Sequence, residues 1–123
     1  MERLKKHHAS FRNAVQGIFW TCTTQHNFQV HLILSLIAIF LGILLQLSQI
    51  EMLVIIMAIV LGLSAEMINT ALEEMTDLIT IEWRKEAKIA KDVSAGMVLV
   101  VAIGTFLIGL NIFLPKLISL LFF

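Results

Sequence analysis

Three carboxylates and one amide recur at helical spacing along one stretch of the sequence, at Glu66, Asn69, Glu73 and Asp77. At about 100° per residue, these side chains fall within one arc of about 80° around a helix. Carboxylates on one face can take a proton from an alcohol, and they can ligate a hard cation such as Mg²⁺. The stripe therefore indicates a site for proton transfer, for magnesium binding, or for both.

The predicted depth of Glu66 distinguishes this stripe from an ordinary solvated helix face. Residues 52–65 are apolar. If the hydrocarbon layer begins near Met52, Glu66 lies about 21 Å along the helix, roughly 9 Å inside the far boundary of a layer about 30 Å thick. An acid at that depth is costly, which makes it a functional candidate. A solvated face remains the interpretation for Glu74, Glu82 and Glu86.

Depth also predicts a division of roles along the stripe. Desolvation at the lipid end makes a carboxylate a stronger proton acceptor, so Glu66 is the candidate general base towards a membrane alcohol. Glu73 and Asp77 lie about 10 Å and about 16 Å further towards the cytosol. There they could ligate or orient Mg²⁺, which prefers oxygen ligands and keeps substrate phosphates in its shell.

A short segment from Lys88 to Asp92 supplies cations beside these carboxylates. Lys88 and Lys91 are candidate phosphate contacts that could neutralise a transferring phosphoryl group, and the alternative is that they only set the topology. The six glycines are dispersed and no GxxxxGK[ST] motif occurs, which excludes a P-loop. Any kinase here must be of another kind.

The composition predicts the elements that must position these residues. The 123 residues are 59% hydrophobic with one proline, which favours a single all-α membrane domain over residues 1–123. Transmembrane helices are predicted at residues 28–47, 50–79 and 93–114, the last closed by Pro115 and Lys116. Residues 10–24 carry an amphipathic pattern that predicts a helix on the membrane surface.

Charge and cysteine content exclude other classes. A formal net charge of zero argues against nucleic-acid binding, and the single Cys22 leaves no intrachain disulfide. Lysine and arginine gather in the N-terminal arm and in residues 84–91, and none lies between the first two spans. The positive-inside rule therefore places the N-terminus and the second connection in the cytoplasm.

Three segments carry a resemblance to a known family: NFQVH (27–31), AEMINTALEEMTD (65–77) and AKIAKDVSAG (87–96). They resemble the prokaryotic diacylglycerol kinase family, which includes undecaprenol kinases, and the likeness covers nearly the whole chain. The resemblance implies a homotrimer in the bacterial cytoplasmic membrane. It also implies transfer of the ATP γ-phosphate to a lipid hydroxyl, with Mg²⁺, at sites shared between neighbouring subunits.

The resemblance also implies roles for single residues. Glu66 matches the family's general base and Glu73 its metal ligand. Asn69 matches the amide of the same motif, and Gly17 matches a glycine near the bound nucleotide. Asp77, Lys91 and Asp92 match the family's nucleotide and phosphate contacts. Gln25 and Gln29 align with a Glu that completes the metal site and with an Arg. The side-chain oxygen of Gln25 can ligate Mg²⁺ but brings no charge. The metal site of this chain would therefore carry one negative charge fewer than a site with Glu at that position.

Several hypotheses stay open at this point. The lipid alcohol is undecaprenol or diacylglycerol, and the segments 27–31 and 90–92 favour undecaprenol by resemblance. A small oligomeric transporter would use Glu66 as a proton carrier but leaves the other polar residues of the stripe unexplained. A catalytically weak family member is the third hypothesis, which Gln25 supports. His31 is interpreted as an interfacial or inter-helix hydrogen-bonding residue rather than a ligand.

Overall fold

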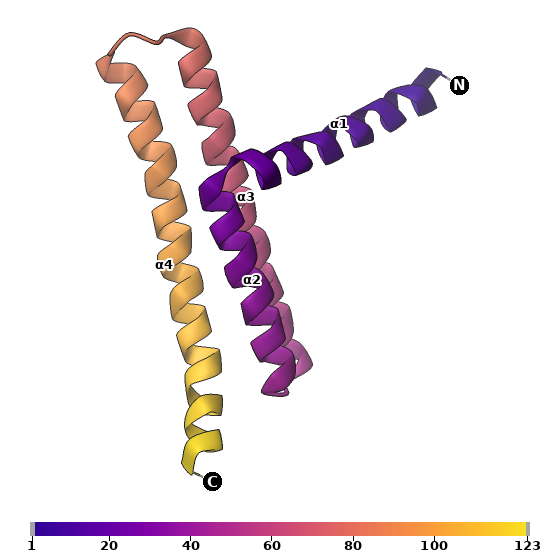
Figure 1. The fold of residues 1–123 in the computed structure, drawn as a ribbon, viewed down its shortest axis with the longest axis vertical. Helices are drawn as coiled ribbons and strands as arrows, with labels where there is room; N and C mark the ends of the chain where they lie inside the picture. The colour runs from indigo at the N-terminus through magenta and orange to yellow at the C-terminus, as the bar shows by residue number, and fades with distance from the viewer. Residues whose placement is uncertain (1, 123) are drawn as a thin grey trace.

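The structure is a computed structural model that describes the backbone of residues 2–122 and the side chains of residues 7–122. Its helices, in chain order, are α1 (Glu2–Thr24), α2 (His26–Leu44), α3 (Gln49–Ile79) and α4 (Lys85–Phe122). Helices α2, α3 and α4 run side by side, while α1 leaves this bundle at a large angle (Figure 1). Helix α3 packs against both α2 and α4, and so occupies the central position from which a site can be built.

Three of these helices are long and apolar enough to cross a membrane, which confirms the predicted class of all-α membrane protein. Helices α2, α3 and α4 contain 19, 31 and 38 residues, and their most apolar windows have mean hydropathies of 2.1, 2.2 and 2.5. Large apolar side chains such as Phe40 and Val100 are exposed on the isolated chain. Exposure of this kind is expected where lipid, rather than water, is the surrounding solvent.

The predicted end of the first transmembrane helix was wrong by one turn. Residues 28–47 were predicted, whereas α2 ends at Leu44. Gln46 has a positive φ of 52°, and the N–H groups of Gln46 and Leu47 donate to the carbonyl oxygens of Ile43 and Gly42. This turn caps the last carbonyl groups of α2 and reverses the chain towards α3, so hydrophobic residues extend beyond the helix itself.

The second transmembrane helix matches the prediction of residues 50–79 to within one residue. Helix α3 begins after Ser48, whose hydroxyl accepts a hydrogen bond of 3.3 Å from the N–H of Glu51. The carboxylate of Glu51 accepts a hydrogen bond of 2.7 Å from the N–H of Ser48. This capping box satisfies two backbone donors and fixes where the helix begins.

The third transmembrane helix was predicted too short at both ends. Residues 93–114 were predicted, with Pro115 as the stop, whereas α4 runs from Lys85 to Phe122 and contains Pro115. Proline removes one backbone hydrogen bond, but apolar surroundings offer the chain no other partners and the helix continues. Lys116 also anchors this end, because its Nζ lies 3.4 Å from Oε2 of Glu51 on α3.

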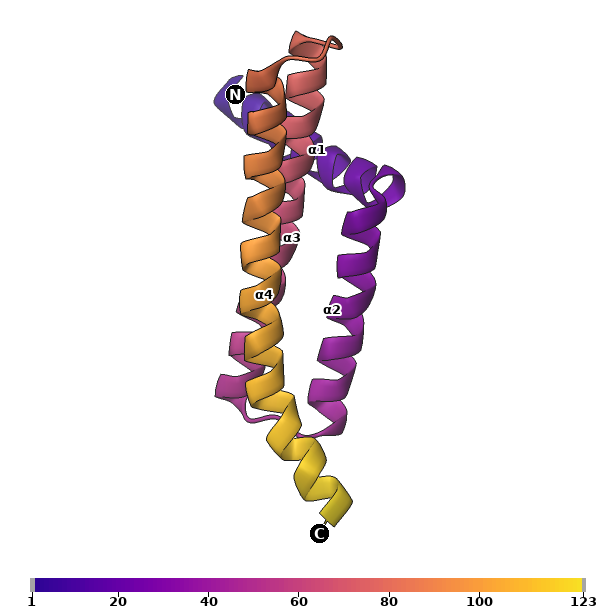
Figure 2. The same cartoon turned by 90° about the vertical axis from the view of Figure 1, so that its left-hand side faces the viewer.

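Helix α1 begins earlier than the predicted residues 10–24, because the basic lead-in is helical from Glu2. Figure 2 shows that α1 joins α2 at the end of α2 that lies towards the α3–α4 connection. Phe11 and Trp20 are exposed on α1. The location of α1 on a membrane surface stays a prediction.

Candidate active site

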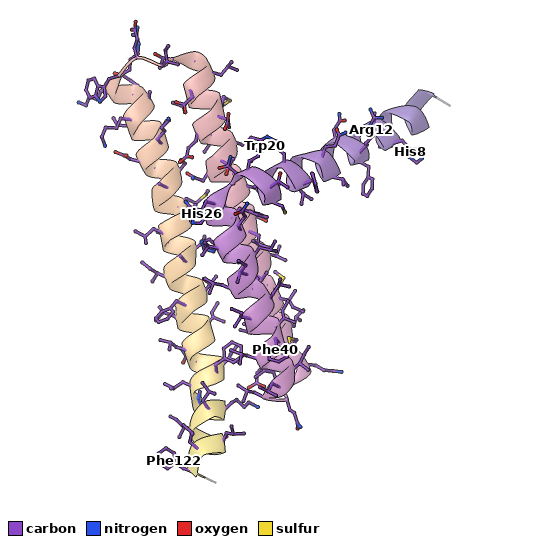
Figure 3. All side chains as sticks on the ribbon, viewed as in Figure 1. His8, Arg12, Trp20, His26, Phe40 and Phe122 are labelled. Atoms are coloured by element: carbon purple, nitrogen blue, oxygen red, sulfur yellow. The ribbon has the colours of Figure 1, made fainter. Side chains whose placement is uncertain are left out.

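Four of the sequence-predicted residues line one small polar pocket between α3 and the start of α2. Gln25, Glu66, Asn69 and Glu73 border a volume of about 160 Å³. The pocket lies at the junction of α1 and α2, which His26 marks in Figure 3. Gln25 therefore shares a pocket with Glu73, although the two residues are far apart in sequence.

Glu66 is the deepest acid of this pocket, since only 3% of the residue is exposed. Oε1 of Glu66 lies 3.3 Å from Nε2 of His31, which α2 contributes. A buried carboxylate needs a partner, because removing its charge from water is costly. The contact with His31 therefore gives the buried carboxylate of Glu66 a polar partner from α2.

Asn69 on α3 connects α4 to the carboxylate of Glu73. The buried hydroxyl of Ser94 on α4 donates a hydrogen bond of 2.7 Å to Oδ1 of Asn69. With its oxygen occupied in this way, Asn69 donates from Nδ2 to Oε1 of Glu73 at 3.1 Å. The chain of hydrogen bonds restricts the rotamers of Asn69 and Glu73, so it orients the predicted metal ligand.

A second pocket of about 430 Å³ lies where α3 ends and α4 begins. It is lined by the four residues of these helices that were predicted to contact the nucleotide or its phosphates, and they form two ion pairs. Nζ of Lys91 lies 2.6 Å from Oδ1 of Asp77, and Lys88 pairs with Asp92 one turn away. Trp83 also lines this pocket. Cations and carboxylates alternate here, which suits a ligand that carries phosphates and hydroxyl groups.

A third cavity, of about 310 Å³, is apolar. The α3 residues that line it precede Glu66, so it lies nearer the N-terminal end of α3 than the two polar pockets do. Helices α2, α3 and α4 form its walls, and Ile55, Ala58 and Gly62 are among the residues from α3. We call this cavity the apolar groove. Its polar lining is sparse, and His31 is part of it. The same side chain thus touches Glu66 and borders the groove.

The three cavities follow one another along α3. Along this helix, residues between 55 and 63 line the apolar groove and residues between 66 and 73 line the polar pocket. Thr76 and Asp77, near its end, line the α3–α4 pocket. At about 1.5 Å per residue, Glu66 and Asp77 are separated by about 16 Å along the axis. One helix therefore presents, in sequence, an apolar cavity, a buried acid and a charged pocket.

Gly17 is the predicted residue that does not join either polar pocket. It is exposed on α1, and a Cβ added to it would meet no atom within 4 Å. Gln29, which aligns with an Arg of the family, donates from Nε2 to the carbonyl oxygen of Cys22 at 3.0 Å. Gln29 thus ties α2 back to α1 in this single chain.

Sequence reasoning missed Ser94 and did not identify the partner of His31. Ser94 stands inside the segment 87–96 that carried the resemblance, but serine in a helix has no spacing signal that predicts a bond to Asn69. The sequence suggested that His31 makes contacts between helices, and the structure confirms an inter-helix contact. The identity of its partner, Glu66, could not be predicted because it depends on how α2 and α3 pack.

The ligand chemistry of the polar pocket fits Mg²⁺. The carboxylate of Glu73 and the amide oxygen of Gln25 are hard oxygen donors, and both face one pocket. Among the described residues, no group of three or more His, Cys, Asp or Glu side chains could hold a metal ion. Mg²⁺ does not require one, since it commonly uses one or two protein ligands together with water and substrate phosphates.

Comparisons with known proteins show the family of the chain. Residues 12–113 match the model of the family described as prokaryotic diacylglycerol kinase. The chain is 43% identical over 114 residues to an undecaprenol kinase of Bacillus subtilis, covering 93% of each chain. It is 38% identical over 113 residues to a diacylglycerol kinase of Synechocystis sp., covering 91% of this chain and 65% of that protein.

The fold and the comparisons together define a class of protein: an all-α lipid kinase with three helices that are long and apolar enough to cross a membrane. The chain belongs to the prokaryotic diacylglycerol kinase family. The segments that carried the resemblance in the sequence, residues 27–31, 65–77 and 87–96, all lie inside the matched region.

Proposed function

We propose that this protein transfers the γ-phosphate of ATP to the hydroxyl group of a membrane lipid alcohol, in a reaction that requires Mg²⁺. The observation that carries the proposal is the order of the three cavities along α3. The apolar groove receives the chain of the lipid, the buried Glu66 meets its hydroxyl, and the α3–α4 pocket holds the nucleotide. This order matches the membrane origin of one substrate and the aqueous origin of the other.

Glu66 acts as the general base in this proposal. Its carboxylate takes the proton from the lipid hydroxyl while the hydroxyl oxygen forms a bond to the γ-phosphorus in line with the leaving group. The bond from the γ-phosphorus to the bridging oxygen breaks, and ADP leaves with that oxygen. Glu66 then releases the proton to water. Burial of Glu66 excludes bulk water, which would compete with the lipid as acceptor.

Glu73 and Gln25 are the proposed protein ligands of Mg²⁺, which would neutralise charge on the phosphates. Asn69, fixed by Ser94, holds Glu73 in position. Asp77, Lys88, Lys91 and Asp92 bind the nucleotide, and a lysine released from its ion pair can accompany the transferring phosphoryl group. Gly17 would contribute to nucleotide binding only through a rearrangement of α1 or through a neighbouring subunit.

We propose undecaprenol as the preferred lipid and diacylglycerol as the second candidate. The segments 27–31 and 90–92 favour undecaprenol by resemblance. The undecaprenol kinase relative is also the more similar of the two relatives described above. The transporter hypothesis has no support from the family, and a catalytically weak enzyme remains the alternative because Gln25 stands in the proposed metal site.

The direct test is phosphorylation of a lipid panel by the purified protein. Radiolabelled ATP, Mg²⁺ and either undecaprenol, diacylglycerol or a long-chain alcohol should yield labelled lipid, with undecaprenol the best substrate by kcat/KM. Labelled phosphate released without labelled lipid would point to hydrolysis and would contradict the proposal. Absence of any product with all three lipids would favour the catalytically weak alternative.

The orientation of the chain is a separate prediction. The excess of Lys and Arg in residues 84–91 predicts that the α3–α4 connection is cytoplasmic and that Ser48 faces outside. In a Cys22→Ala background, the cysteine of a Ser48→Cys variant should react with an impermeant maleimide in intact cells. A cysteine at Glu86 should react only after the cells are opened. The reverse pattern would remove access of the site to cytosolic ATP.

We also propose that the enzyme is a homotrimer whose subunits share sites in the cytoplasmic membrane of a bacterium. The polar pocket of one chain is small, at about 160 Å³, and much of the apolar surface of α3 is exposed on a single chain. A neighbouring copy would cover that surface and enlarge the site. Native mass spectrometry of the detergent-solubilised protein should give three times the mass of one chain, and a monomer would contradict this proposal.

A further inference from the structure

His31 occupies a position between two cavities that have different chemistry. It lies on α2, and its side chain is 31% exposed. The residue lines the apolar groove, while its Nε2 lies 3.3 Å from Oε1 of Glu66, which lines the polar pocket. The imidazole therefore stands where the lipid chain would meet the acid that accepts the lipid proton.

The contact with His31 also matters for the buried carboxylate of Glu66. Within the described residues, His31 is the one ion-pair partner of this carboxylate, which is 3% exposed. An imidazole N–H at Nε2 can donate to a carboxylate oxygen. Because a carboxylate has two oxygens, an imidazole that holds Oε1 leaves Oε2 to accept a different proton.

We propose that His31 is a positioning residue for phosphoryl transfer. It holds one oxygen of Glu66, so the second oxygen is directed to the hydroxyl of the lipid that enters from the apolar groove. The inference rests on the proposed function, since it assumes that Glu66 is the general base. It assigns to His31 a role in the rate of transfer and not in the binding of ATP.

A purely structural role for His31 predicts different behaviour. Its neighbours in the apolar groove include Leu34, Ala38 and Ile59, so a leucine at position 31 would meet apolar side chains and fill similar space. If His31 only packed α2 against α3, His31→Leu would therefore preserve turnover. If His31 positions Glu66, the same substitution releases the carboxylate from its partner and slows the chemical step.

The experiment compares three variants at position 31 in the intact protein. His31→Leu should lower kcat for lipid phosphorylation by about 10- to 100-fold, a part of the usual contribution of a general base, with KM for ATP changed less than about 2-fold. His31→Gln, which keeps an N–H donor at similar reach, should retain kcat within about 5-fold. His31→Asn has the same donor on a shorter side chain, and it should behave like His31→Leu.

His8→Gln is the matched control, because His8 is exposed on α1 and lines none of the cavities described above. It should leave kcat and KM unchanged. If His31→Leu does not fold, as judged by gel filtration in detergent, the kcat values of His31→Gln and His31→Asn test whether His31 positions Glu66. Equal kcat in those two variants and the wild-type protein would overturn the inference.

A double variant tests whether His31 acts through Glu66. If it does, His31→Leu combined with Glu66→Gln should be no slower than Glu66→Gln alone, because the group that His31 positions has already been removed. Additive losses would show an independent role and overturn the inference. An inactive wild-type protein on every lipid would overturn the proposed function and this role together. An active protein with a fully active His31→Leu variant would overturn the role of His31 alone.

Discussion

Glu66→Gln should lower kcat for lipid phosphorylation by at least about 100-fold, within the usual range for loss of a general base. The substitution keeps the shape of the side chain and its ability to accept a hydrogen bond, but it removes the proton acceptor. Because Glu66 lies about 16 Å along α3 from Asp77 in the proposed nucleotide pocket, KM for ATP should change little. Initial rates at saturating lipid, measured with labelled ATP, give both parameters.

Glu74→Gln is the matched control for this prediction. Glu74 lies on the same helix and is exposed, and it borders neither of the polar pockets. Its variant should retain the wild-type rate. Near-normal turnover of Glu66→Gln would show that another group takes the proton, and the mechanism proposed above would then be wrong even if the enzyme is a lipid kinase.

Glu73→Gln should raise the Mg²⁺ concentration for half-maximal activity at least about 10-fold, or abolish activity, because it removes the only charged ligand in the proposed metal site. Gln25→Glu should have the opposite effect and lower that concentration, since two carboxylates attract Mg²⁺ more strongly than one. The double variant should recover part of what Glu73→Gln loses, because the pocket regains one carboxylate. Titration of Mg²⁺ in the phosphorylation assay measures all three effects.

The position of Gln25 makes this series informative. Gln25 and Glu73 line the same pocket, so the structure satisfies one condition for a shared ion. If Gln25→Glu leaves the Mg²⁺ dependence unchanged while Glu73→Gln shifts it, Gln25 does not ligate the metal. Glu86→Gln serves as the control for general effects of acidic residues at this end of the molecule, because Glu86 is exposed and lies outside the polar pockets.

Much of the fold could be predicted from hydrophobic patterning, but the helix ends could not. Span length and apolar runs located α2, α3 and α4, because a membrane helix leaves a long signal in composition. The prediction failed at Leu44, where a turn ends α2 before the apolar run ends, and at Pro115, which α4 contains. Both errors concern backbone hydrogen bonds, which side-chain hydropathy does not report.

The sequence by itself determined which face of α3 carries the candidate chemistry, because helical periodicity alone places Glu66, Asn69 and Glu73 on one stripe. Only the tertiary structure decided what meets that face. The packing of α2 brings His31 to Glu66 and Gln25 to the pocket of Glu73, and the packing of α4 brings Ser94 to Asn69. These contacts depend on how helices distant in sequence are rotated against each other, and one-dimensional spacing within a helix carries no information about that rotation.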